Sequence, residues 1–412
     1  MIFHPDPREK ESTAWAGVLA WVAFIYLTIP LARRIQEVVR DRAGKAPFLW
    51  VTFLAFGVAA IWIVRALLRK QWTARPAQVA VLVGVGALFC WLTWSLRDIP
   101  EEAFHFVQYG VLSLLLFRAL RHRLQDLSIY LAATLAGAAF GILDELIQWV
   151  VPLRYFDYRD IWINVQAVGL VQIALVAGIR PGGVGGRPSR TGIQLVCRFA
   201  IVTLLLLLVC VSSTPRTVEW VARYLPAAIV FDHIPSEYGF RIEDPDIGVF
   251  FSRLPAEELL RQDRERGTEA AQRINRIRAD DQYRAFLREL PAHRDPLAVE
   301  ARIHLFRRDR YMAEAKKREE SGDFHWHAHV AWRENQILET YFSHTLQHSR
   351  FGWSPERRER MLARAQPLGP YQSAVSQHLI TRLTQARATA LLLILMLAAI
   401  AGDRWEAREK VK

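Results

Sequence analysis

The chain has 412 residues, of which 52% are hydrophobic, and a formal net charge of +12. Residues 1–213 form a series of long apolar runs, whereas residues 214–386 are rich in charged side chains. The segment from Thr214 to Arg387 holds 28 Lys or Arg against 25 Asp or Glu. Most of the positive excess therefore lies in loops beside apolar runs, where it orients membrane helices, and we exclude nucleic acid as a partner.

Eight apolar runs are candidates for transmembrane helices. About 20 helical residues, each rising about 1.5 Å, cross a hydrocarbon layer of roughly 30 Å. The runs are residues 14–32, 47–68, 77–96, 102–119, 127–151, 161–179, 193–212 and 388–402. No small-residue cleavage site follows the first run, so we expect a retained helix there and not a signal peptide.

The Lys and Arg side chains of the short loops predict the orientation, because their translocation is disfavoured. With the N-terminus inside, the inner segments carry 16 of them and the outer segments 8, five of which lie in an expected loop from Arg33 to Lys45. We therefore expect an integral protein of a bacterial inner membrane, with residues 214–386 on the outer side.

The predicted fold class is mainly α: a polytopic membrane bundle of about seven helices plus a C-terminal helix, joined to an α-helical soluble domain. We predict three domains: a transmembrane domain at 1–213 with a core at about 77–180, a soluble extracytoplasmic domain at 214–386, and a C-terminal membrane helix with a cytoplasmic tail at 387–412. Within the soluble domain, periodicity predicts helices over about 256–290, 296–320, 331–348 and 354–386.

Ionisable side chains recur within the apolar stretch from Asp98 to Gln172, at the same ends of three predicted helices. A charge at mid-bilayer costs roughly 2.5–3.5 kcal/mol on insertion scales, so such groups point to a functional site. Asp98 is the expected N-cap of the first helix, on which Glu101, His105 and Tyr109 share one face. Glu101 would then contact His105; the alternative is a capped helix with a structural histidine.

The second and third groups lie at the end of the next helix and the start of the one after it. Glu145 and Gln148 share a face with Gly141, whose small size permits close helix approach, whereas Asp144 is expected to point elsewhere. The alternative is a pair of polar residues that only ties two helices together. The third group is Arg154, Asp157, Asp160 and Asn164.

In the third group, Asp160 and Asn164 share a face at a helix start, where free N–H groups suit an anion. Arg154 can form a bidentate pair with a carboxylate or a phosphate. The alternative here is a structural Arg–Asp clasp that closes the loop.

Together the three groups resemble the VanZ-like family of integral membrane proteins over about residues 98–172. The matching residues are Glu101, His105, Phe106, Tyr109, Gly141, Glu145, Gln148, Arg154, Asp157, Asp160 and Asn164. Glu102 departs from the family, which commonly has a basic residue there, and Ala167 stands where it tends to have Gly. The family is associated with glycopeptide antibiotic resistance, so the resemblance implies a membrane and cell-envelope setting.

Histidines of the soluble domain are weaker candidates, for a metal site. His325, His327 and His329 alternate and would share one face of a strand. His344 and His348 are spaced to chelate zinc on a helix. No acid forms a recognised catalytic arrangement with them, so structural roles are favoured and no cofactor is predicted.

Three functions stay open. The favoured one is binding of the headgroup of a lipid or lipid-linked envelope precursor, through Arg154, Asp157, Asp160, Asn164, Gln148 and Tyr109. The second is acid–base catalysis of a hydrolysis or transfer reaction, with His105 as the base, Glu101 orienting it and Glu145 as the acid or a second base. The third is a membrane scaffold whose outer domain, residues 214–386, recruits a partner protein.

Overall fold

The computed structural model describes residues 9–69, 75–151, 154–224, 234–277, 282, 285–286, 289–319 and 324–408. The chain is mainly α, as predicted, and folds into two compact units. The first unit comprises residues 1–213, 221–235 and 388–412, and the second comprises residues 214–220 and 236–387.

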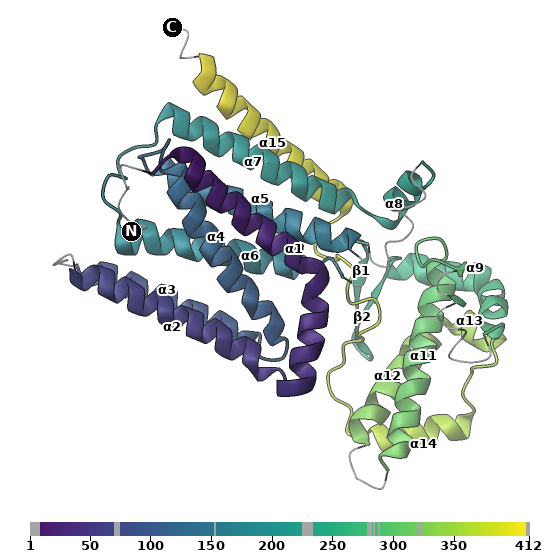
Figure 1. Ribbon diagram of the computed structural model, residues 1–412. Helices are drawn as coiled ribbons and strands as arrows, with labels where there is room; N and C mark the ends of the chain where they lie inside the picture. Colours follow the sequence, from purple (N-terminus) through teal and green to yellow (C-terminus); the bar gives the residue numbers. More distant parts are fainter. Residues whose placement is uncertain are drawn as a thin grey trace. The chain divides into compact units, whose positions relative to one another are not determined.

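The first unit is a bundle of long helices (Figure 1). They are α1 (Glu11–Ala43), α2 (Ala46–Arg69), α3 (Pro76–Ser95), the 3₁₀ turn η1 (Pro100–Ala103), α4 (Phe104–Leu120), α5 (Ser128–Val150), α6 (Tyr158–Ile173) with its π-helical extension η2 (Ala174–Ile179), α7 (Arg190–Ser212) and α15 (Gln385–Arg408). Eight helices of the described chain are long and apolar enough to cross a membrane, and each contains one predicted span. The short helix α8 (Pro215–Ala222) follows α7.

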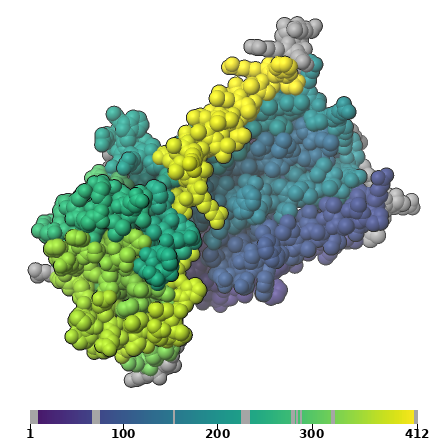
Figure 2. Space-filling view, turned by 180° about the vertical axis from the view of Figure 1, so that it is seen from behind, coloured from purple at the N-terminus to yellow at the C-terminus, as the bar shows by residue number. Residues whose placement is uncertain are grey.

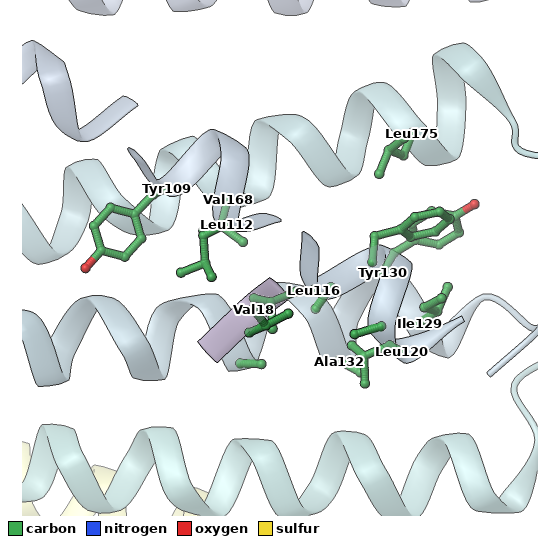
Figure 3. Packing of buried hydrophobic residues seen from close by; sticks show 14 of the residues in the cluster. Val18, Tyr109, Leu112, Leu116, Leu120, Ile129, Tyr130, Ala132, Val168 and Leu175 are labelled. Carbon is green, nitrogen blue, oxygen red and sulfur yellow. The ribbon is translucent and has the colours of Figure 1, made fainter. Parts of the chain in front are cut away.

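Burial separates the inner helices of this bundle from the outer ones. In α4, α5 and α6, between 50% and 61% of the membrane-spanning segment is buried inside the protein, against 6% to 11% in α2, α3, α7 and α15. The exposed faces of the outer helices are apolar, as lipid contact requires. The inner helices thus form the core, where Leu112, Leu116 and Leu120 of α4 lie among buried residues that include Val168 of α6 (Figure 3).

Small and polar residues hold the inner helices together. A Cβ atom at Gly137 of α5 would lie 2.7 Å from the Val168 side chain, so only glycine permits this approach. Ser113 donates to the Val168 carbonyl at 3.0 Å, and Gln172 donates to the Ser113 hydroxyl at 2.8 Å. Such contacts are the usual means of helix association inside a membrane, where the hydrophobic effect does not drive it.

Two helices differ from expectation or extend it. The expected loop from Arg33 to Lys45 is wrong: α1 stays helical to Ala43, with Pro30 inside it, and bends on the way (Figure 1). Helix formers follow Pro30, and a proline kinks a helix without necessarily ending it.

At the other terminus, α15 lies along α7 (Figure 2), where Asp403 accepts from Arg198 at 3.0 Å.

The second unit packs helices against a small antiparallel sheet. Its elements are β1 (Phe240–Asp244), β2 (Gly248–Ser252), α9 (Ala256–Asn275), α11 (Pro296–Lys317), α12 (His325–Tyr341), α13 (Ser343–His348) and α14 (Pro355–Ala365). The sheet pairs Phe240 with Ser252 and Asp244 with Gly248. The helix expected over 354–386 ends at Ala365, because Pro367 and Pro370 follow within five residues.

Candidate functional site

The three groups of polar side chains meet at one end of the inner helices. His105 of α4 lies close enough to interact electrostatically with Asp144 of α5 and with Asp160 of α6. Arg154, in the loop before α6, interacts with the same two carboxylates. Because α4, α5 and α6 run alternately up and down, the start of α4, the end of α5 and the start of α6 coincide. We call the following side chains the polar cluster: Glu101, Glu102, His105, Tyr109, Asp144, Glu145, Gln148, Arg154, Asp157, Asp160 and Asn164.

At the start of α4, two ion pairs replace the expected contact with the histidine. Asp98 is not the N-cap, since Ile99 precedes η1 and no side chain caps it. Glu101 accepts from Arg40 of α1 at 2.9 Å and makes no hydrogen bond to His105, so the expected Glu–His pair is wrong. Glu102 pairs with Arg159 of α6.

The other two residues expected on this face of α4 do lie together. The rings of His105 and Tyr109 stack with centroids 6.2 Å apart. Tyr109 is fully buried, and its hydroxyl interacts with the Asp144 carboxylate (Figure 3 shows its ring at one edge of the apolar core). The spacing of four residues placed both side chains correctly.

At the end of α5, a chain of hydrogen bonds fixes a buried carboxylate. Glu145 is fully buried; its Oε1 accepts from Gln148 at 2.6 Å and its Oε2 from the Asp157 backbone at 3.0 Å. Gln148 accepts in turn from Arg154, whose Nε lies 3.0 Å from Gln148 Oε1. The loop is therefore clasped by an Arg–Gln–Glu relay, and the Arg–Asp ion pair beside it joins Arg159 and Asp157 at 3.8 Å.

The N-terminus of α6 already holds a carboxylate of the chain. Asp157 is the N-cap, and its side chain accepts from the Arg159 backbone at 2.7 Å. One turn further, Asn164 is fully buried and lies against Gly141 of α5, where an added Cβ atom would come within 2.8 Å of the Asn164 Cβ. Gly141 therefore allows the close approach that its size predicts.

Asp144 lies with the other polar side chains, whereas the sequence predicted that it points away from them. Its side chain is 1% exposed and belongs to the polar cluster. The helical spacing already indicates this position, because Asp144 follows Gly141 by three residues and precedes Gln148 by four, which places it on their face of α5. The role of Arg40 and the pairing of Glu102 with Arg159 were not predicted, since each pair joins residues that lie far apart in the sequence.

Several buried atoms of the polar cluster have no hydrogen-bond partner among the described residues. They are Glu101 Oε2, Glu102 Oε2, His105 Nδ1, the Tyr109 hydroxyl, Asp144 Oδ1, Asp160 Oδ1, and both Oδ1 and Nδ2 of Asn164. Buried polar groups are nearly always paired, and each unpaired one costs about 1–3 kcal/mol. The polar cluster thus has unused capacity to bind polar groups.

The histidines of the second unit do not gather into a site. His325, His327 and His329 lie on α12, so the strand considered for them is wrong, and residues two apart on a helix point to different sides. On α13, His348 contacts the backbone carbonyl of His344 at 2.8 Å. Within the described ranges no group of three or more His, Cys, Asp or Glu is placed to hold a metal ion.

A different buried network, which the sequence did not suggest, lies in this unit. Glu334 of α12 contacts His304 at 2.5 Å and accepts from Tyr371 at 2.6 Å and from Ser373 at 2.7 Å. Burial alone would raise the pKa of Glu334, but His304 and these donors outweigh it and hold the pKa below its ordinary value. The network joins α11, α12 and the segment after α14.

Comparison with known proteins supports the resemblance seen in the sequence. Residues 14–176 match the model of the VanZ/LLP1 family. The match covers α1 to α6 and includes every residue of the polar cluster. No curated protein and no solved structure matches the chain.

Proposed function

We propose that the VanZ/LLP1 family region of this membrane protein, residues 14–176, binds the headgroup of a membrane lipid or lipid-linked envelope precursor. The observation that carries this proposal is Asn164. Its amide is fully buried between α5 and α6, and neither polar atom has a partner in the described part of the chain. A buried amide of this kind is a ready ligand for polar groups.

The position of the polar cluster supports a headgroup as the ligand. The cluster occupies helix ends, and exposed aromatic side chains surround the same ends: Trp91, Trp94, Tyr155 and Trp162. Amphipathic rings prefer the membrane–water boundary, where headgroups also lie. From the loop charges we further propose that this boundary is the outer face of a bacterial inner membrane.

The geometry favours binding over acid–base catalysis. A general base needs a partner that orients it, and Glu101, the expected partner of His105, is paired with Arg40. Glu145, the expected acid, is held by Gln148 and by the Asp157 backbone. Recruitment of a partner protein by the second unit gains no support from a specific contact.

The test is lipid retention by the full-length protein after purification in mild detergent, with bound lipid identified by native mass spectrometry. Asn164→Leu keeps the side-chain size and removes both amide groups, and we expect it to lower retained lipid at least about fivefold. Gln172→Leu is the matched control, since Gln172 is a buried amide on the same helix that bonds to Ser113 away from the polar cluster. Equal retention by the two variants would refute the proposal.

A further inference from the structure

We propose that the headgroup bound by the polar cluster carries a primary ammonium group. This inference rests on the proposed function and specifies its ligand. It departs from the expectation that Arg154 binds an anionic group, because the Arg154 guanidinium is already engaged by Gln148.

The first support is charge balance. Asp144, Glu145 and Asp160 have no Lys or Arg within 4.0 Å among the residues that the structure describes, and Asp144 and Glu145 are almost completely buried. The neighbouring arginines, Arg40 and Arg159, pair with Glu101 and Glu102 instead. His105 and Arg154 lie near Asp144 and Asp160 but form no direct ion pair with them in the described part of the chain. Buried carboxylates without a direct ion pair are unfavourable, so a bound cation would stabilise this arrangement.

The second support is the kind of hydrogen bond that the polar cluster can still make. Five of the eight unpartnered atoms are acceptors: carboxylate oxygens of Glu101, Glu102, Asp144 and Asp160, and the amide oxygen of Asn164. Asn164 Nδ2 is a donor, and His105 Nδ1 and the Tyr109 hydroxyl can take either role. An ammonium group offers three donors and no acceptor, whereas a phosphate offers acceptors that would face these oxygens. The helix N-terminus that could hold an anion is capped by Asp157.

The third support is a neutral side chain, Asn164, which lies among the carboxylates. Its amide is neutral, 0% exposed, and lies four residues after Asp160 and beside Gly141, which is four residues before Glu145. One helical turn therefore separates it from a carboxylate on each of two helices. An amide oxygen in this position adds a neutral acceptor to the surrounding carboxylates.

The rim of the polar cluster suits the rest of such a headgroup. Arg40 and Arg159 expose 48% and 45% of their side chains, so both can contact a phosphate at the surface while still holding their glutamates. A zwitterionic headgroup with its ammonium inside and its phosphate at the rim satisfies both sets of groups.

The test compares lipids with identical acyl chains in nanodiscs that contain the full-length protein. Equimolar phosphatidylethanolamine, phosphatidylcholine and phosphatidylglycerol are supplied, and the lipid retained after detergent extraction is quantified. We expect phosphatidylethanolamine to be enriched at least about fivefold over both others. Trimethylation removes the N–H donors but keeps the charge, and the glycerol headgroup keeps hydroxyl donors but lacks the positive charge.

Asp144→Asn should lower the enrichment at least about threefold, and Gln172→Leu should leave it unchanged, both in protein that elutes as a single species. Equal retention of phosphatidylcholine would show that donors are irrelevant, and equal retention of phosphatidylglycerol that charge is irrelevant; either result overturns the inference. If all three lipids were retained equally and Asn164→Leu abolished their retention, the proposed function would hold and only this inference would fail. If Asn164→Leu left lipid retention unchanged, both the inference and the proposed function would fail.

Discussion

Arg154 donates two hydrogen bonds, from Nε at 3.0 Å and from Nη2, to the single side-chain oxygen of Gln148. Gln148 then donates to Glu145 at 2.6 Å, so the arginine orients a buried carboxylate through an amide. Because Glu145 also accepts from the Asp157 backbone, the relay fixes the start of α6 against the end of α5. The position of Asp160 and Asn164 depends on this connection.

Gln148→Leu should release the loop before α6, because it removes the acceptor of Arg154 and a donor to Glu145. Hydrogen bonds to charged groups contribute about 1.5–3 kcal/mol, so hydrogen exchange at the Asp157 amide should become at least about tenfold faster. Hydrogen exchange with mass spectrometry on the full-length protein measures this. Gln172→Leu is again the control, and an unchanged rate at Asp157 in Gln148→Leu would show that the relay does not hold the loop.

Gly141→Ala should disturb the polar cluster, because its new Cβ atom would lie 2.8 Å from the Asn164 Cβ. Overpacking of this kind costs about 1–3 kcal/mol, which should lower the thermal unfolding midpoint and reduce retained lipid. Gly169→Ala on α6 is the control, since nothing lies within 4 Å of its added Cβ atom. There the higher helix propensity of Ala should leave stability equal or raise it by up to about 1 kcal/mol. A Gly141→Ala protein as stable as Gly169→Ala would contradict the close approach.

Much of the membrane unit follows from its sequence. Long apolar runs require helices, because no water satisfies a backbone inside lipid, and helices that alternate in direction bring every second end together. The meeting of His105, Asp144 and Asp160 therefore follows from the spacing of the runs. Helical periodicity also places Tyr109 beside His105 and Gly141 beside the third group.

The partners of these residues could not be derived in the same way. Glu101 is paired with Arg40, 61 residues earlier, on a part of α1 that lies beyond the first apolar run and was expected to be a loop. Periodicity gives the face of a helix but not the neighbour that covers it, so Asp144 was expected to face a neighbour or the loop and not the other two groups. In the second unit, the alternation of His325, His327 and His329 would suit a strand. These residues instead lie on helix α12, which packs against α11 and α14.

Labelling of introduced cysteines should show which side of the membrane the polar cluster faces. In a protein with Cys90, Cys197 and Cys210 replaced, we expect Tyr155→Cys to react with a membrane-impermeant maleimide in intact cells. Gly186→Cys, an exposed position in the loop before α7, should react only after the membrane is opened. The reverse pattern would place the polar cluster on the cytoplasmic side.

The second unit should lose stability in acid through Glu237, which accepts from Arg253 at 2.7 Å and contacts His378 at 2.8 Å. Burial would raise its pKa, but these partners outweigh it and lower the pKa to about 2, from an ordinary value of 4.5. The unfolded chain therefore takes up the proton first as the pH falls. The stabilisation is present above pH 4.5 and is lost as the pH falls to about 2, by about 3 kcal/mol.

Glu237→Gln should flatten this dependence, because the amide does not titrate. The loss of stability can be measured as hydrogen-exchange protection of β1 and β2, since Glu237 precedes β1 and Arg253 follows β2. The measurement is made on the full-length protein from pH 5 to about pH 2 and is corrected for intrinsic exchange rates. Glu359→Gln, an exposed position on α14 with no ion pair among the described residues, should keep the acid dependence of the unaltered chain. If the Glu237→Gln protein lost protection over the same pH range as the unaltered chain, another carboxylate, such as Glu334, would have to carry the effect.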